Sequence, residues 1–205
     1  MKHLKTLAIA GMTAAFLTVL LGAGSASATV LCKKNVIPCQ EADYPANTTF
    51  HMTLEAETSS VFRDTTKNVV GTCTTSTIEG TTSNTGAAGK PVEGPLKALT
   101  FGGCASATAV IELGKFQIHY VAGTNTLGAL TLVGTKVTIS SVFGSCVYGS
   151  GAGVEIGELT GGAPAKADIN TVVTKISGSF ICPTSIVWEA KYVVTVPEPL
   201  YFKDS

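Results

Sequence analysis

Apolar and polar side chains alternate along most of the chain beyond residue 48. The clearest case is residues 48–57, where Phe50, Met52 and Leu54 alternate with polar residues. Alternation places successive side chains on opposite faces of a strand, so it predicts a strand with one buried face. The pattern recurs in short segments at regular spacing, which indicates an all-β sandwich or barrel. We expect strands at residues 48–57, 60–63, 68–79, 96–101, 107–113, 116–122, 127–133, 136–142, 154–159, 165–174, 176–182 and 186–196.

Two Gly-rich segments lack this alternation. Residues 80–94 combine Gly, Ser, Thr, Asn and Pro, and residues 146–153 read CVYGSGAG. We expect both to be loops, and long loops in compact domains often carry function. Residues 165–174 are the one segment compatible with a helix, but Val172 and Val173 favour a strand.

The last expected strand, residues 186–196, has a purely apolar face opposite a mixed one, which suggests a central position in a sheet. We expect Trp188 and Tyr192 to lie in the core for this reason. The apolar face is formed by Trp188, Ala190, Tyr192, Val194 and Val196.

The first 28 residues resemble a secretory signal peptide. Lys2, His3 and Lys5 precede an apolar run at residues 7–21, and Ala26-Ser27-Ala28 is a small-residue cleavage site. A membrane anchor would need roughly 20 unbroken apolar residues, and Leu31 stands where a lipoprotein signal needs a small residue before Cys32.

Cleavage after Ala28 would leave residues 29–205 as a single domain, secreted or associated with the cell wall, with no membrane span. All six cysteines lie after this site, and an even number in an exported chain indicates disulfides. The proposed pairs are Cys32–Cys39, Cys73–Cys104 and Cys146–Cys182.

Composition and charge narrow the possible functions. Only 14% of the residues are charged, and the 14 basic residues equal the 14 acidic ones. Such a balance provides no basic face for nucleic acid or for anionic lipid. Frequent β-branched residues also exclude a disordered chain.

Catalytic and metal sites are weakly supported. His51 and His119 lie within alternating strands, where a polar side chain is ordinarily solvated, whereas catalytic bases are usually found on loops or strand ends. The pairs Glu55 and Glu57, and Glu155 and Glu158, fit an exposed strand face better than an acid/base pair. No nucleophile elbow, closely spaced zinc cysteines or calcium loop occurs in the sequence. We therefore expect no catalytic residue, metal or cofactor.

Ligand binding is the remaining class of function. Secreted β-domains often bind saccharides with exposed aromatic side chains, and Tyr148 in the second Gly-rich segment is the best candidate. The candidate ligand-binding residues are Asn84, Tyr148 and Ser150.

Four segments resemble a group of uncharacterised secreted six-cysteine, β-rich proteins of high-GC Gram-positive bacteria. They are CTTSTIEGTTSNTG (73–86), CVYGSGAG (146–153), FICPTS (180–185) and PLYF (199–202). The resemblance implies export and a single β-rich domain, and it implies no activity.

The sequence thus predicts an all-β, antiparallel sandwich or barrel-like domain of about a dozen short strands, held by disulfides. The favoured function is a non-enzymatic binding module for an extracellular saccharide or protein. The alternatives are a hydrolase that uses Glu55, Glu57, His51 or His119, and a structural envelope protein without a ligand. A buried Tyr148 and the lack of a pocket would favour the structural alternative.

Overall fold

The computed structural model describes residues 29–36, 39, 43–86, 90–124, 126–141 and 144–204, without the side chains of 107–111 and 141. The expected signal peptide lies outside these residues. The described chain forms β-strands only, and it has no helix capable of crossing a membrane. The strands are β1 (Thr29–Cys32), β2 (Thr49–Leu54), β3 (Ser60–Asp64), β4 (Val69–Thr81), β5 (Val92–Cys104), β6 (Ala107–Glu112), β7 (Lys115–Tyr120), β8 (Leu127–Val133), β9 (Lys136–Ser141), β10 (Gly144–Gly149), β11 (Val154–Thr160), β12 (Lys166–Gly178), β13 (Ser185–Val196) and β14 (Tyr201–Asp204).

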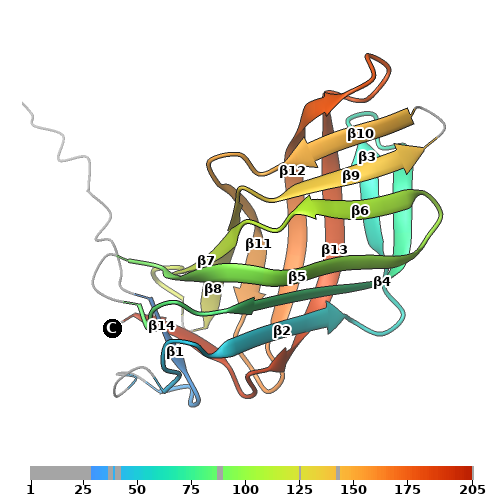
Figure 1. The fold of residues 1–205 in the computed structure, drawn as a ribbon. Coiled ribbons are helices and arrows are strands. Elements are labelled where there is room, and N and C mark those ends of the chain that lie inside the picture. The colour runs from blue at the N-terminus through green and yellow to red at the C-terminus, as the bar shows by residue number, and fades with distance from the viewer. Residues whose placement is uncertain are drawn as a thin grey trace, which may run out of the picture.

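Eight of the strands pair in a closed ring. The ring runs β4–β5–β7–β8–β11–β12–β13–β2 and returns to β4, with every neighbouring pair antiparallel. The ring is flattened into two layers. Figure 1 shows β2, β4 and β5 in one layer, crossing in front of β12 and β13 in the other. The predicted all-β, antiparallel fold is confirmed.

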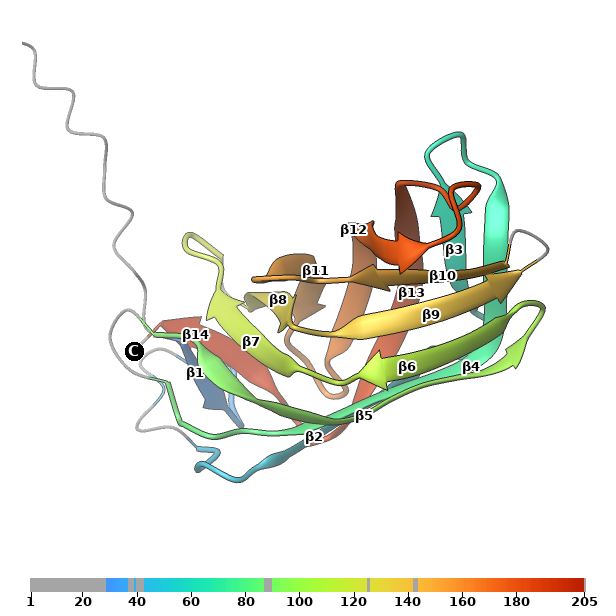
Figure 2. The same ribbon diagram turned by 45° about the horizontal axis from the view of Figure 1, so that its top comes forward.

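The longest strands extend the ring in one direction. Strands β4, β5 and β12 have 13 residues each and β13 has 12. Beyond the ring, β3 pairs with both β13 and β4, and β10 joins β12 to β9 and β6. We call this the distal end; it carries the β3–β4 connection (residues 65–68) and the β12–β13 connection (residues 179–184). Figure 2 shows both connections at the end opposite β1 and β14, which form a separate two-stranded sheet.

The core lies between the two layers of the flattened ring. The rings of Phe62, Phe101 and Trp188 pack together, with centroids 5.4–6.1 Å apart. The Trp188 indole donates to Oγ of Ser60 (2.8 Å), and the buried Tyr192 hydroxyl bonds to Oγ of Ser76 (2.7 Å). The predicted core positions of Trp188 and Tyr192 are confirmed. The indole N–H and the phenol hydroxyl both have hydrogen-bond partners within the core.

Val196 does not lie on the same face of β13 as Trp188 and Tyr192, contrary to the sequence prediction. The register between β13 and β2 shifts between Val194 and Val196. This irregularity turns Val196 outward, and its side chain is exposed. Alternation cannot reveal such a bulge because the extra residue reverses every later side chain.

All three predicted disulfides are present. Cys32–Cys39 links residues near β1, with Cα atoms 6.0 Å apart. Cys73 and Cys104 are direct partners in the β4–β5 register, and Cys146–Cys182 joins β10 to the β12–β13 connection. Two of the disulfides therefore hold the distal end.

Several predicted boundaries are wrong because glycine was interpreted as a loop residue. Strand β4 continues to Thr81 and β5 begins at Val92, so the expected loop at 80–94 is much shorter. A side chain at Gly80 would place its Cβ 2.6 Å from Cε1 of Phe116, and one at Gly94 would lie 1.8 Å from the Thr81 carbonyl oxygen. These glycines permit close packing between strands.

The second Gly-rich segment and its partner strand also differ from the prediction. The first part of residues 146–153 belongs to β10, which covers Gly144–Gly149. Residues 165–174 form a strand as expected, but β12 continues to Gly178, so residues 176–182 are not a separate strand. Strands β1 and β14 were not predicted.

Candidate functional site

Tyr148 is buried, so its predicted exposure is wrong. It follows Cys146 by two residues in β10, and both side chains face the core. Tyr148 is 3% exposed, and its hydroxyl donates to the Pro183 carbonyl oxygen at 3.2 Å. Burial raises the pKa of this phenol above its ordinary value. Tyr148 therefore supports the β12–β13 connection from beneath.

Ser150 is also buried and joins three turns. Its Oγ accepts from the Thr135 amide, and its own amide donates to the Thr135 carbonyl, each at 3.0 Å. The Thr135 hydroxyl in turn donates to the Leu113 carbonyl at 2.6 Å. The Ser150 hydroxyl and amide are both used within the fold, so Ser150 has a structural role here.

Asn84 lies far from Tyr148, in the β4–β5 connection at the other end of the ring. Its Oδ1 accepts from the amides of Gly86 and Glu93, each at 3.2 Å. The side chain thus orders its own connection, as Asn commonly does in turns. The structure does not bring the three candidate ligand-binding residues together in one site.

The residues of the hydrolase alternative gain no support from the geometry. Lys166 donates to Glu55 at 2.5 Å, and this hydrogen bond with the lysine charge lowers the pKa of the Glu55 carboxyl. A carboxyl that stays ionised cannot act as a general acid near neutral pH. His51 bonds to the Thr195 hydroxyl at 2.7 Å, on the outer face.

The other candidate acids and bases also lie on the surface. His119, Glu155 and Glu158 are exposed on β7 and β11. Among the described residues, no three His, Cys, Asp or Glu side chains lie close enough to hold a metal.

The cavities are also poorly suited to a ligand. An apolar cavity of about 30 Å³ lies between the layers, next to Trp188 and Tyr148. A single water needs roughly 10–15 Å³, so this space would hold a few waters and no organic molecule. Hollows of 360, 340 and 230 Å³ open on the outer face around Glu55, Thr58 and Asp168.

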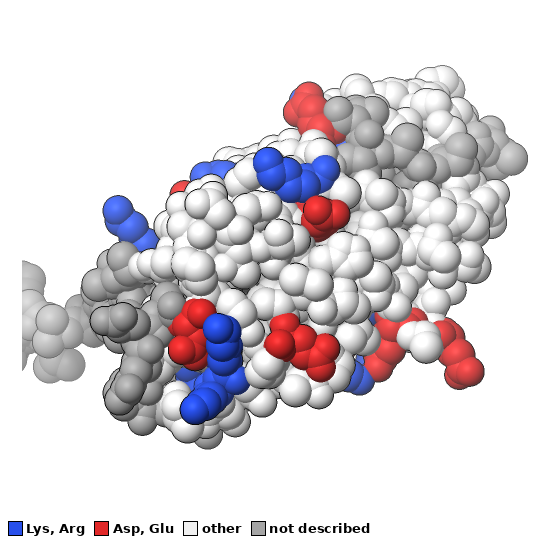
Figure 3. All heavy atoms as spheres, turned by 60° about the horizontal axis from the view of Figure 1, so that its bottom comes forward, with Lys and Arg blue, Asp and Glu red and all other residues white. Residues whose placement is uncertain are grey.

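The outer hollows are lined by Thr, by apolar side chains and by charged side chains, several of which are paired with one another. Lys166–Glu55 and Lys191–Asp168 are ion pairs here, with N–O distances of 2.5 and 3.5 Å. Figure 3 shows one face of the molecule, where blue and red groups are scattered over a largely white surface.

The β12–β13 connection has the most unusual side-chain exposure. Phe180 is 94% exposed and Ile181 is 49% exposed, whereas Cys182 is 3% exposed and is bonded to Cys146. We call residues 179–184 the anchored loop. An exposed Phe with an exposed Ile beside it is costly in water, since each would gain by leaving the solvent.

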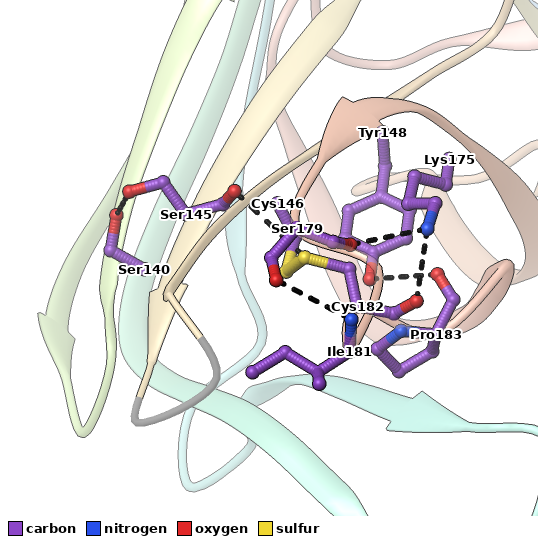
Figure 4. Close-up of a disulfide and its surroundings, with 9 residues drawn as sticks. All are labelled: Ser140, Ser145, Cys146, Tyr148, Lys175, Ser179, Ile181, Cys182 and Pro183. Carbon is purple, nitrogen blue, oxygen red and sulfur yellow. Dashed lines mark hydrogen bonds between the residues drawn. A yellow bond between two sulfur atoms is a disulfide. The ribbon is translucent and has the colours of Figure 1, made fainter.

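Lys175 holds the anchored loop from the end of β12. Its ammonium group donates to the carbonyl oxygens of Ser179 (3.3 Å) and Cys182 (3.1 Å). Figure 4 shows the Lys175 side chain lying across the loop, while Ile181 points away from these hydrogen bonds. The Cys182 amide donates to the Ser179 carbonyl at 3.1 Å, and the Ile181 amide faces Oγ of Ser179 at 3.4 Å. The loop is thus fixed by a disulfide, a lysine and its own backbone.

Exposed apolar side chains also lie on the strands of the distal end. Val172 on β12 is in register with Val187 on β13, which is in register with Arg63 on β3, and Arg63 with Val69 on β4. Val69 and Val172 are exposed, and so is Ile176 near the end of β12. We call Val69, Val172, Ile176 and Val187 the distal apolar face.

The sequence prediction missed this site because residues 176–182 were interpreted as a strand. A signal for the loop was present, since Gly178-Ser179 and Pro183 are turn formers on either side of Phe180. Gly178 has φ of 121°, a conformation that side chains rarely adopt. It marks the end of β12.

No protein-family model, curated protein or solved structure matches the chain. The resemblance to secreted six-cysteine proteins therefore stays a prediction.

Proposed function

We propose that this protein is an exported, non-enzymatic binding protein that contacts its partner through the anchored loop, with Phe180 as the central contact. The observation that carries the proposal is the 94% exposure of Phe180 on a loop that is held by the Cys146–Cys182 disulfide and by Lys175. Aromatic side chains are enriched at protein interfaces and dominate their energetics. An aromatic side chain held out in water on a rigid support is suited to this role.

The rigidity of the loop supports the proposal. A flexible loop would lose conformational entropy on binding, whereas a loop fixed in advance avoids much of that cost. The Cys146–Cys182 disulfide and the two hydrogen bonds from Lys175 provide this fixation before any partner is present.

Export is supported by the cysteines. Three disulfides among the described residues are typical of proteins outside the cytoplasm, where thiols are not kept reduced. The signal-peptide pattern of residues 1–28 points to the same compartment.

An apolar partner surface fits the loop better than a saccharide does. Tyr44, Tyr148, Trp188 and Tyr192 are buried and cannot stack on a sugar ring. Phe180 and Ile181 carry no side-chain hydrogen-bond donor or acceptor, which saccharide recognition ordinarily requires. The structural alternative, an envelope protein without a ligand, is favoured by the buried Tyr148 and the small internal cavity, but it does not explain an exposed Phe180.

The test compares two apolar side chains at opposite ends of the molecule. Phe180→Ala should reduce retention of the protein on cell envelopes by about tenfold or more. Val196→Ala removes an exposed apolar side chain from the other end of β13 and should leave retention unchanged. Both variants should keep the thermal stability and the three disulfides of the wild type. The proposal would be overturned if envelopes retained Phe180→Ala as well as they retain the wild type. It would also be overturned if envelopes retained the wild type no better than an unrelated protein after the same washing.

A further inference from the structure

A hollow on the outer face of β12 and β13 has the size and the lining to receive the tip of the anchored loop. We infer that the partner of this loop is a second copy of the chain, whose hollow takes up Phe180. This inference rests on the proposed function, because it names the partner of the same loop. We call the recess the β13 hollow; it is lined by Thr58, Ser59, Val61, Asp168, Ile169, Asn170, Glu189, Ala190 and Lys191.

The β13 hollow forms where β13 changes its partner strand. β13 pairs with β3 up to Glu189 and with β2 from Tyr192 onward. Between these two pairings the chain runs through the β2–β3 connection, where the Glu55 amide donates to the Lys191 carbonyl at 2.8 Å. No regular strand therefore continues beside Ala190 on this side, and the surface is recessed there.

The size of the β13 hollow suits an aromatic ring. Its volume is 360 Å³, whereas the internal cavity has about 30 Å³. Pockets that bury organic molecules span about 300–1,000 Å³. Val61, Ile169 and Ala190 contribute apolar atoms to the lining. A free small molecule would stay in contact with water in this open hollow, but a ring carried by a facing protein surface would be covered.

The rim of the β13 hollow can also satisfy the backbone of the loop tip. Within the described chain, the amide and carbonyl of Phe180 and the carbonyl of Ile181 have no hydrogen-bond partner. The Asn170 side chain makes no hydrogen bond there either. A carboxamide both donates and accepts. Asn170 of a second copy therefore matches the unpaired groups of the tip, which an apolar partner without polar groups would leave unsatisfied.

The charges around the contact are balanced. Residues 176–186 contain no charged side chain, so the tip is neutral. On the facing side, Lys191 is paired with Asp168 at 3.5 Å and Glu189 with Arg63 at 2.8 Å. Entry of a neutral tip brings no like charges together and separates neither ion pair.

Apolar side chains border the β13 hollow on its distal side. Val172 follows Asn170 by two residues on the outer face of β12, and it is in register with Val187 on β13. When Phe180 occupies the hollow, Ile181 beside it can contact these two valines. The neighbouring hollow of 340 Å³ is less suitable, because eight of its ten lining residues are Thr, Ser or Glu.

The tip and the hollow are different surfaces of the molecule, so the contact is head-to-tail. The anchored loop lies at the distal end (Figure 2), and the β13 hollow lies farther along the outer face of β12 and β13. Each copy offers its tip to one neighbour and its hollow to another. Such an assembly continues to grow with concentration unless the rotation between copies closes a ring.

Sedimentation velocity of the purified protein at rising concentration tests this arrangement. We expect the wild type to form species larger than a dimer. Phe180→Ala should lower the association constant by about ten- to hundredfold, as expected for one Phe side chain left in water. Asn170→Trp fills the β13 hollow and should also weaken association. Thr174→Trp adds the same side chain to an exposed position of β12 outside the hollow, and should associate like the wild type.

Mixing two variants tests the head-to-tail contact directly. Phe180→Ala keeps the hollow, and Asn170→Trp keeps the tip. Each should stay monomeric by itself at concentrations where the wild type associates. An equimolar mixture should form a one-to-one dimer that does not grow further, because only one tip and one hollow remain. A mixture that stays monomeric, while each variant keeps the thermal stability of the wild type, would overturn the inference.

Failure of the inference can be distinguished from failure of the proposed function. A wild type that stays monomeric at every concentration would overturn the second copy as partner; if Phe180→Ala still loses envelope retention, the binding role stands and the partner is a different molecule. Wild-type association that Phe180→Ala does not weaken would assign the contact to another surface and would also overturn the inference. If Phe180→Ala in addition keeps its envelope retention, the proposed function fails as well.

Discussion

Phe180 and Cys182 are separated by one residue, yet their side chains are 94% and 3% exposed. The buried sulfur fixes the base of the anchored loop, and the exposed ring forms its tip. The contrast places an apolar anchor and its covalent support within a single short loop. The disulfide should therefore matter for binding as well as for stability.

Replacement of both Cys146 and Cys182 by Ser tests this coupling. The two cysteines of this disulfide are separated by 36 positions in the sequence. In the loop-entropy model, its removal should lower the free energy of unfolding by about 3–4 kcal/mol. Envelope retention should fall too, at temperatures where the variant is still folded, because the loop regains freedom. Chemical denaturation and retention assays measure the two effects.

The matched control is replacement of Cys32 and Cys39 by Ser. This pair closes a shorter loop, with a sequence separation of 7, at the other end of the molecule. Its removal should cost less stability and leave retention unchanged. If the Cys146 and Cys182 variant binds envelopes as well as the wild type does, the disulfide has no part in presenting Phe180.

Local alternation was sufficient to predict most of the strands. Residues 127–133 were predicted with the bounds that β8 has, and the three cysteine pairs are correct. The strands follow from the side-chain period, and the disulfide pairs from the spacing of the cysteines along the chain. Such information does not specify that the strands close into a ring.

The candidate site could not be predicted because its key residues depend on tertiary packing. Gly149 lies under Ile176, since a Cβ there would be 2.4 Å from Cδ1 of that side chain. Gly149 is the last residue of β10, and Tyr148 beside it faces the core. Sequence alone does not distinguish such a glycine from a turn residue. The exposure of Phe180 was likewise hidden by the longer extent of β12.

Close strand packing at glycine can be tested with two matched substitutions. Gly94→Ala would place a Cβ 1.8 Å from the Thr81 carbonyl oxygen, so β4 and β5 must separate. Gly71→Ala would place a Cβ 3.5 Å from Cδ2 of Phe62, an ordinary contact. We expect Gly94→Ala to lower the free energy of unfolding by about 2–4 kcal/mol, and Gly71→Ala to change it by less than about 1 kcal/mol.

Urea denaturation of the two alanine variants measures this difference. Both substitutions also restrict the unfolded chain to the same extent, so that contribution cancels in the comparison. Equal stabilities would show that the approach of Gly94 to Thr81 does not limit side-chain size.

The buried Tyr192 hydroxyl should make stability depend on alkaline pH. Burial raises the pKa of this phenol above its ordinary value of 10.0, and the hydrogen bonds to Ser76 and Ser60 offset only part of the effect. The folded protein therefore holds the proton more tightly than the unfolded chain does. This contribution is fully present below pH 10 and is lost as the pH rises from there toward the folded-state pKa. Denaturation midpoints of wild type should thus fall as the pH is raised above 10.

Tyr192→Phe removes the ionisable group and keeps the ring. At neutral pH it should cost about 1 kcal/mol, because the hydrogen bond to Ser76 is lost while the Ser76 hydroxyl still bonds to the Thr100 carbonyl at 2.7 Å. Above pH 10 the variant should lose stability less steeply than the wild type, since one fewer tyrosine must stay protonated in the folded state. Parallel pH profiles of the two proteins would contradict the buried phenol as a source of alkaline sensitivity, and would assign it to the remaining tyrosines and lysines instead.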